Sequence, residues 1–263
     1  MALTVDVIEQ LAAELDAAHQ ERREIVKITE NQPALDEKDA YDIQYAIRRR
    51  RLARGHRVAG LKMGLTSRAK MKQMGVEKPI FGFMTEDFAL APGAEVPVGR
   101  YIHPSVEPEI VFVTRPALRG PGCHAASVLA ATDFVAAGIE LLDSRYRDFK
   151  FDLNSVIADN TSAAGFAVGD CVRDARELDL ATLGVVFEKN GEIVAVGAGA
   201  AVLGNPAASV AMLANMLAER GEELPAGSML LTGGITEAIA VAPGDHVCLR
   251  VQNLGPVSLR FVP

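Results

Sequence analysis

The chain is poor in residue types that mark several protein classes. It has no tryptophan, 5% aromatic residues and three cysteines, Cys123, Cys171 and Cys248. The cysteines are widely separated and form no CxxC pair, which argues against a disulfide framework or a structural zinc site. Unpaired cysteines are typical of a reducing compartment. We therefore expect a cytoplasmic protein.

Signals for export, membrane insertion and nucleic-acid binding are also missing. The N-terminal stretch MALTVDVIEQLAAEL has neither a basic n-region nor a continuous apolar core, and we find no unbroken apolar run of about 18 residues. We expect neither secretion nor a membrane span. The formal net charge is −7, and the only dense basic run is Arg48–Arg51, which we interpret as a solvated helix end. This balance disfavours a nucleic-acid partner.

What is present suits a globular protein with a large core. The 263 residues are 49% hydrophobic and 23% charged. Thr4 and Asp36 each precede an apolar stripe at helical spacing, which predicts helices at 5–22 and 36–54. Beyond them, Asn190-Gly191 predicts a tight hairpin turn, and Asn205-Pro206 predicts a helix start. We expect a helical N-terminal portion at 1–55 and a β-rich domain at 56–263.

Three carboxylates stand in unusually apolar surroundings. Glu107 and Glu109, in HPSVEPEIVFV, are two residues apart and would point to the same side of a strand. Glu140 lies in the middle of the apolar run 134–142, where an ionised side chain needs a cation, a metal or a proton. If the strands are neighbours, the three acids converge on a hard ion such as Mg²⁺ or Mn²⁺. The alternative is that Glu107 and Glu109 are solvated and Glu140 pairs with an arginine such as Arg145.

Three further motifs carry candidate ligands. Lys62 is the only charge in the apolar stretch VAGLKMGLTS; it is either a fixed ammonium for an anionic substrate or a lysine that reaches the surface. The ADNTS segment, with Asp159 and Ser162, could present polar groups to a ligand or form an Asx turn. Thr232, in LLTGG, begins a loop that could hold a carboxylate or be a plain tight turn. His124 is expected to cap or pack a helix start.

Taken together, HPSVEPEI, GIELLDSRY, ADNTS, GLKMGLTS and LLTGGITEAI resemble the fumarylacetoacetate hydrolase superfamily over essentially the whole chain. Within it the chain is most similar to the hydratase and decarboxylase branch of the meta-cleavage pathway for catechols. The resemblance implies an α+β fold, with a β-rich core of the mixed β-sandwich or roll type and a small helical N-terminal portion. It implies that Glu107, Glu109 and Glu140 bind Mg²⁺ or Mn²⁺ and that Lys62 is the catalytic cation.

The same resemblance places Asp159, Ser162 and Thr232 around the substrate. Its branch contains two sister activities, the hydration of 2-hydroxypenta-2,4-dienoate and the decarboxylation of 2-oxo-3-hexenedioate to that dienoate and CO₂. GLKMGLTS, GPGCH and FKFDLNSVIADN resemble the decarboxylase. In VEKPIFG, Ile80 stands where hydratases typically carry an acid, so we expect decarboxylation. Ile80, with Met71 or Met74 of a short helix expected at 68–74, would give the departing carboxylate apolar surroundings.

Other members of the superfamily leave alternatives open. The chain could be the sister hydratase, an enzyme that cleaves a C–C bond in an acylpyruvate, or a non-catalytic partner subunit of the hydratase. The resemblance also implies a small 2-oxo dicarboxylate as substrate, and a homo-oligomer, a complex with the sister hydratase, or both.

Overall fold

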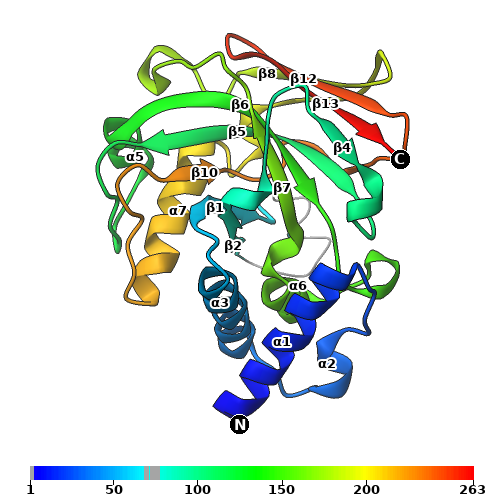
Figure 1. The fold of residues 1–263 in the computed structure, drawn as a ribbon. Helices are drawn as coiled ribbons and strands as arrows, with labels where there is room; N and C mark the ends of the chain where they lie inside the picture. Colours follow the sequence, from blue (N-terminus) through cyan, green and yellow to red (C-terminus); the bar gives the residue numbers. More distant parts are fainter. Residues whose placement is uncertain (1–2, 68–70, 72–77) are drawn as a thin grey trace.

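A computed structural model describes residues 3–67, 71 and 78–263, and it combines helices with two β-sheets (Figure 1). The α+β class is therefore confirmed. The helices are α1 (Val5–Glu21), α2 (Ile28–Asn31), α3 (Glu37–Ala53), α5 (Ala125–Ala131), α6 (Leu153–Ala158) and α7 (Pro206–Glu219). The short helix expected at 68–74 lies outside the described residues apart from Met71.

The larger sheet has eight strands within the described part of the chain, in the order β2-β1-β10-β5-β6-β7-β3, with β11 paired to β5. Its strands are β1 (Val58–Gly64), β2 (Ile80–Thr85), β3 (Ala89–Leu90), β5 (Ser105–Thr114), β6 (Thr132–Leu142), β7 (Ala163–Val168), β10 (Met229–Leu231) and β11 (Ile239–Ala240). The β5–β6 ladder, from Ser105↔Leu142 to Thr114↔Thr132, lies at its centre. Both strands are almost continuously buried because both of their faces are covered.

The smaller sheet has the order β4-β13-β12-β8-β9 and packs through β12 and β13 against β6. Its strands are β4 (Glu95–Pro97), β8 (Gly184–Lys189), β9 (Glu192–Ala198), β12 (His246–Val251) and β13 (Gly255–Val262). Asn190 and Gly191 have φ values of 56° and 85°, as a two-residue hairpin turn requires, so the predicted hairpin is confirmed. The two sheets together bury the middle of β6.

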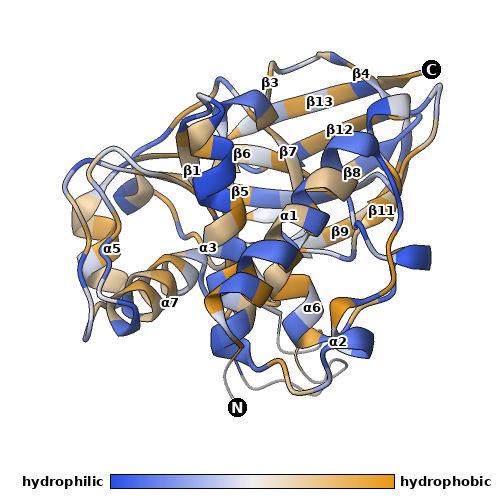
Figure 2. Cartoon of the chain, turned by 60° about the horizontal axis from the view of Figure 1, so that its bottom comes forward, coloured by the Kyte–Doolittle hydropathy of each residue, from blue (hydrophilic) through white to orange (hydrophobic). Residues whose placement is uncertain are grey.

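The N-terminal helices begin where the sequence predicts. The side chains of Thr4 and Asp36 accept hydrogen bonds from the backbone N–H groups of Val7 and Asp39, and Asp36 forms a capping box. Figure 2 shows hydrophilic and hydrophobic residues on α1, whose apolar side packs on α3, while α3 packs on α6. Helices and sheets share the larger of two hydrophobic clusters among the described residues. A domain boundary at residue 55 stays a prediction.

The basic end of α3 differs from its expected solvated state at one residue. Arg51 is buried, lies 4.3 Å from the centre of the Phe88 ring and forms an ion pair of 2.6 Å with Asp87. The aromatic face and the carboxylate replace the water that an exposed guanidinium would have. The neighbouring arginines of the run remain partly exposed or pair at the surface.

One segment, Gly199–Glu219, is long and apolar enough by composition to be compared with a membrane span, and 56% of its most apolar window is buried. Within it, α7 is helical over 14 residues, or about 21 Å, whereas the hydrocarbon core of a bilayer is about 30 Å thick. Helix α7 packs against α5 and β1. It is a core helix of the fold, capped by Asn205 and begun by Pro206 as the sequence predicts.

Gln44 ties three elements together and gives a test of the packing. Its buried Nε2 donates hydrogen bonds of 2.9 Å to the carbonyls of Phe81 on β2 and Ile157 on α6. We expect Gln44→Leu to lower the free energy of unfolding by about 2–4 kcal/mol, because two buried carbonyls lose their donor. Urea unfolding measures this loss. Exposed Gln10→Leu is the control, and equal midpoints for the two variants would contradict the prediction.

Candidate metal centre and active site

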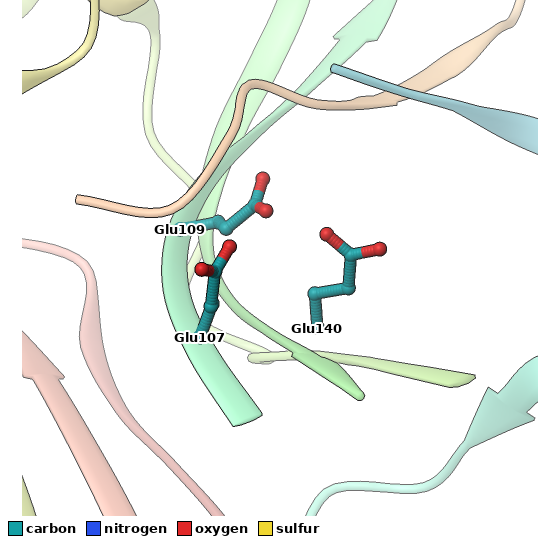
Figure 3. A group of neighbouring side chains, drawn as sticks. All are labelled: Glu107, Glu109 and Glu140. Atoms are coloured by element: carbon teal, nitrogen blue, oxygen red, sulfur yellow. The ribbon is translucent and has the colours of Figure 1, made fainter. Parts of the chain in front are cut away.

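The three predicted acids converge at the centre of the larger sheet. Glu107 on β5 stands opposite Glu140 on β6, and Glu109 follows two residues along β5. One carboxylate oxygen from each lies within 4.8 Å of the other two, and all three side chains are buried. Figure 3 shows the carboxylates facing a common space. Adjacent antiparallel strands thus bring together acids that are more than thirty positions apart in the sequence.

Burial sets the electrostatics of this cluster. It raises the pKa of Glu109 well above the ordinary carboxyl value, and the nearby charge of Glu140 raises it further. Burial also raises the pKa of Glu140, while the ammonium of Lys62 acts in the opposite direction. Oε1 of Glu109 and Oε2 of Glu140 have no hydrogen-bond partner among the described residues. Buried, unpartnered carboxylate oxygens fit a hard divalent cation, so the cluster could hold one.

Lys62, on β1, is the cation of the site within the described residues. Its side chain is 3% exposed, and its Nζ lies 3.0 Å from Oε1 of Glu140 and 3.0 Å from the carbonyl of Thr161. The alternative in which Lys62 reaches the surface is therefore wrong. The alternative partner for Glu140 is also wrong, because Arg145 bonds instead to Asp159.

The ADNTS segment forms a left-handed turn at the edge of the site. Asn160, Thr161 and Ser162 have φ values of 49°, 53° and 59°. Each non-glycine residue in this region costs about 1–2 kcal/mol, and runs of three are unusual. The buried hydroxyl of Ser162 has no hydrogen-bond partner among the described residues, and Ser162 lines the cavity described below. The turn therefore presents a polar edge to the site.

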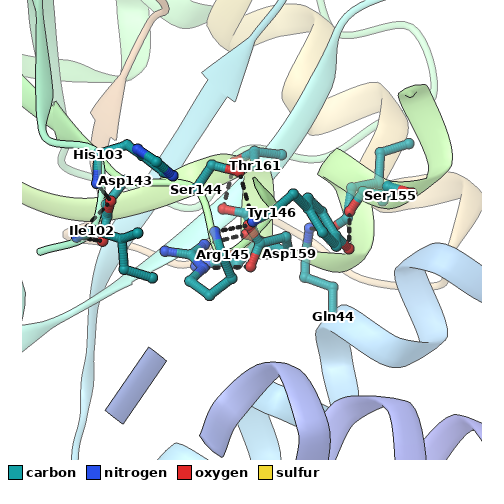
Figure 4. A network of polar contacts seen from close by, with 12 residues as sticks. Gln44, Ile102, His103, Asp143, Ser144, Arg145, Tyr146, Ser155, Asp159 and Thr161 are labelled. Atoms are coloured by element: carbon teal, nitrogen blue, oxygen red, sulfur yellow. Dashed lines mark hydrogen bonds and ion pairs between the residues drawn. The ribbon is translucent and has the colours of Figure 1, made fainter. Parts of the chain in front are cut away.

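Asp159 does not contact the cavity, contrary to the expectation for it. Its Oδ1 accepts a hydrogen bond of 2.5 Å from Nε of Arg145, and its Oδ2 accepts one of 3.1 Å from the backbone N–H of Arg145 (Figure 4). Burial raises the pKa of Asp159 to about 6, against the opposing effect of Arg145. One carboxylate oxygen of Asp159 is thus used in an ion pair and the other in a backbone hydrogen bond, and both contacts support the turn.

Thr232 also supports the site and does not line the cavity. Its hydroxyl donates to the carbonyl of Ile110 at 2.8 Å, and its own carbonyl accepts from the hydroxyl of Ser209 at 2.7 Å. The next residue, Gly233, has a φ of 104° and donates its backbone N–H to Oε2 of Glu109 at 2.7 Å. The LLTGG loop therefore holds a carboxylate, as the sequence suggested, but that carboxylate belongs to the protein.

A cavity of about 420 Å³ opens beside the acids. Lys62, Glu107, Thr161 and Ser162 lie at its polar part, and Ile80 lies among its apolar lining. The remaining described lining residues are Gly64, Leu65, Leu142, Phe149, Phe151, Val156, Glu237 and Ala238. Met71 is not part of this lining, and Met74 lies outside the described residues.

Sequence reasoning missed much of the apolar wall. Phe149 and Phe151 are two residues apart in the polar stretch RDFKFDLN, and this alternation was the available signal that both side chains face the same apolar surface. The alternation does not predict the positive φ of 57° at Phe149. Leu142 and Val156 look like ordinary core residues in the sequence, so only the folded chain shows that they face a cavity.

Fold and site together define a class: an enzyme of mixed β-sheet architecture, with buried carboxylates that could hold a divalent metal beside a cavity of small-molecule size. The chain belongs to the fumarylacetoacetate hydrolase family, whose description "Fumarylacetoacetate (FAA) hydrolase C-terminal" matches residues 54–262. The architecture and the resemblance stated from the sequence motifs are therefore confirmed.

Individual relatives are similar over nearly the whole chain. A 4-oxalocrotonate decarboxylase of Pseudomonas sp. (strain CF600) is 56% identical over 99% of this chain and 98% of its own length. The structure of 4-oxalocrotonate decarboxylase from Pseudomonas putida G7, complexed with magnesium and adipate, has a TM-score of 0.98 at 53% identity and covers 99% of both chains. A 2-hydroxyhexa-2,4-dienoate hydratase of Comamonas testosteroni is 36% identical over 97% of each chain.

The raised pKa of Glu109 predicts how pH affects the metal-free protein. A folded-state pKa above the unfolded value favours the protonated, folded form, so this contribution to stability is lost as pH rises from near 4.5 toward the raised value. With chelator present, Glu109→Gln should therefore gain stability relative to wild type as the pH rises above 4.5. Melting temperatures measure the difference. Exposed Glu192→Gln is the control, and parallel curves for Glu109→Gln and wild type would contradict the prediction.

Proposed function

We propose that this chain is a divalent-metal-dependent carboxy-lyase that converts 4-oxalocrotonate (2-oxo-3-hexenedioate) to 2-hydroxypenta-2,4-dienoate and CO₂ in the meta-cleavage degradation of catechols. The observation that carries the proposal is the buried Glu107, Glu109 and Glu140 cluster beside a cavity with both polar and apolar lining residues. The 56% identity to a 4-oxalocrotonate decarboxylase supports the choice of reaction.

The metal ligands are proposed to be Glu107, Glu109 and Glu140, and the ion Mg²⁺ or Mn²⁺. Three carboxylate groups without thiolate or imidazole suit such hard cations. When bound, the ion supplies a Lewis acid for the negative charge that develops on the 2-oxo group. The G7 relative was solved with magnesium and adipate, a saturated six-carbon dicarboxylate, which supports a dicarboxylate as the ligand of this cavity.

In the reaction, the C5–C6 bond of the substrate breaks and C6 leaves as CO₂. Its electron pair forms the C4–C5 double bond, the C3–C4 pair moves to C2–C3, and the 2-oxo oxygen gains negative charge. Protonation of that oxygen gives 2-hydroxypenta-2,4-dienoate. No external oxidant or reductant takes part, so the protein has to stabilise charge at one end and release a neutral gas at the other.

Lys62 is proposed as the catalytic cation. Its ammonium lines the cavity and is held beside Glu140, so it adds positive charge at the polar part without having to be desolvated during the reaction. The hydroxyl of Ser162, buried and unpartnered among the described residues, is available to hydrogen-bond a substrate oxygen. Both groups are fixed before substrate arrives, which is the condition under which electrostatic catalysis is effective.

Ile80 is proposed to act at the departing carboxylate. With Leu142, Phe149, Phe151 and Val156 it forms an apolar part of the cavity lining. Such a surface solvates a carboxylate poorly but accepts neutral CO₂, and so favours loss of the carboxylate. Ile80 itself offers no acid or base to activate water, which a hydratase needs at that end of the substrate.

The reaction is tested by following the ultraviolet absorbance of 2-oxo-3-hexenedioate with and without Mg²⁺. We expect metal-dependent turnover that Glu140→Gln lowers by about a hundredfold or more, because one carboxylate charge of the metal site is lost. Glu192→Gln, at an exposed strand end, is the matched control. Wild-type rates in metal-free buffer, or in Glu140→Gln, would show that the site does not perform this chemistry.

The second candidate is the hydratase activity of the same branch, which the 36% identity to a hydratase supports. The two reactions differ in product: a hydratase forms 4-hydroxy-2-oxopentanoate from 2-hydroxypenta-2,4-dienoate. The apolar setting of Ile80 favours decarboxylation. Rapid formation of the hydroxy acid by the pure chain would overturn that assignment and leave the metal site unaffected.

Replacing Lys62 tests the cation separately from the metal. We expect Lys62→Ala to lower kcat by about a hundred- to a thousandfold, because a fixed charge at the polar part of the cavity is lost. The metal content, measured by mass spectrometry after dialysis, should remain. Lys189→Ala removes a partly exposed ammonium far from the acids in sequence and serves as the control. An unchanged kcat in Lys62→Ala would exclude the proposed role.

Three further proposals concern the setting of the enzyme. The unpaired Cys123, Cys171 and Cys248 suit a reducing cytoplasm. A homo-oligomer, a complex with the sister hydratase, or both, would pass the dienoate product to the enzyme that hydrates it. Residues 1–55 and 56–263 are proposed as a helical portion and a catalytic domain, and the catalytic domain carries the three acids.

A further inference from the structure

The strained turn beside the active site is fixed to the larger sheet by one side chain. Nδ2 of Asn160 donates to the carbonyl of Phe83 on β2, and the backbone N–H of Phe83 donates to Oδ1 of Asn160, both at 2.9 Å. An amide side chain paired with both backbone groups of one residue acts as a neighbouring strand would. The edge strand β2 is thus paired on its outer side by Asn160.

Close approach of the turn depends on a glycine in β2. A Cβ on Gly82 would lie 2.4 Å from Oγ1 of Thr161 and 2.9 Å from both the carbonyl oxygen and Oδ1 of Asn160. Only glycine leaves this space. In the β1–β2 ladder Gly82 stands opposite Lys62, so the turn approaches the sheet beside the lysine.

That approach determines where the ammonium of Lys62 lies. Its Nζ is held from two sides, by Oε1 of Glu140 at 3.0 Å and by the carbonyl of Thr161 at 3.0 Å. A lysine side chain has several rotatable bonds, and a single contact would leave it a range of positions. The carbonyl belongs to the middle residue of the turn, directly after Asn160, so a shift of the turn moves this acceptor.

The other contacts of the turn act elsewhere. The ion pair with Arg145 holds Asp159, the residue before the turn. At the other end of the turn, the backbone N–H of Asp143 donates to the carbonyl of Ser162 at 2.9 Å. Both contacts tie the turn to the chain around the end of β6. Within the described part of the chain, the hydrogen bonds of the Asn160 amide tie the turn to β2.

We propose that Asn160 is a positioning residue of the active site: by pairing with Phe83 it holds the left-handed turn so that the Thr161 carbonyl fixes Lys62 beside Glu140 and Ser162 faces the cavity. Asn160 itself does not line the cavity. Asn160 would act through its neighbours: its buried amide determines where the ammonium of Lys62 lies. This proposal rests on the proposed function only in the experiment that measures turnover, and the acylation experiment does not depend on it.

The chain contains a matched control for this role. Asn190, in the β8–β9 turn, is also left-handed, with a φ of 56°, and its amide also makes two bonds of 2.8 Å, to Oδ1 of Asp245 and from the backbone N–H of His246. Replacing either asparagine by glycine keeps a residue that accepts positive φ and removes only the amide. Asn160→Gly and Asn190→Gly thus lose the same kind of bonding at different places.

Two measurements separate positioning from general stability. The first is the acylation rate of Lys62 by limiting acetic anhydride, read by peptide mass spectrometry in the metal-free protein. The second is kcat and KM for 2-oxo-3-hexenedioate with Mg²⁺. We expect Asn160→Gly to raise the acylation rate by about tenfold or more and to lower kcat by about tenfold or more, with KM changed by less than about threefold. Asn190→Gly should leave all three near wild type.

Each outcome decides the proposal. Wild-type acylation and kcat in folded Asn160→Gly would overturn it, as would equal changes in both glycine variants. If Asn160→Gly does not fold, Asn160→Asp is used: it keeps the acceptor for Phe83 and loses the donor, and the same two changes are expected at smaller size. If wild type does not turn over the substrate, the proposed function fails, and the acylation rates still decide whether Asn160 positions Lys62.

Discussion

The architecture of this protein depends on the repulsion among carboxylates that have been removed from water. Glu107, Glu109 and Glu140 lie buried with an oxygen of each within 4.8 Å of the others. Ionised acids at such spacing in a low-dielectric interior are stable only with compensating positive charge or with bound protons. One ammonium, that of Lys62, is nearby, and the divalent cation proposed above would supply the remaining positive charge. Burial of the acids is thus the physical basis of the proposed metal requirement.

The surroundings of the acids are organised to keep them in place. The backbone N–H of Gly233 bonds to Glu109, and Lys62 pairs with Glu140. The Arg145–Asp159 ion pair stabilises the left-handed turn, whose backbone contacts Lys62. Buried polar networks are stable only when their members are satisfied. Oε1 of Glu109 and Oε2 of Glu140 have no hydrogen-bond partner among the described residues, and the carboxylates face a common space (Figure 3). The fold therefore leaves oxygens of these two acids available to a metal.

Local sequence signals were reliable where the governing physics is local. The caps at Thr4 and Asp36, the Asn190-Gly191 hairpin and the start of α7 at Asn205-Pro206 all depend on a few neighbouring residues, and the structure confirms them. His124 caps α5, as expected. Sequence signals failed where a partner far away in the chain determines the environment of a side chain. Arg51 is buried against Phe88 and Asp87, and Asp159 forms an ion pair with Arg145.

The sequence alone indicated three acids and one lysine in apolar stretches, because a charge among apolar neighbours leaves a visible contrast. It also determined the family, through motifs spread along the chain. Only the tertiary structure decided that Glu107 faces Glu140, that Lys62 bonds the Thr161 carbonyl, and that Phe149 and Phe151 line a cavity. These facts depend on strand register and on a left-handed turn, which are fixed by contacts between residues far apart in the chain.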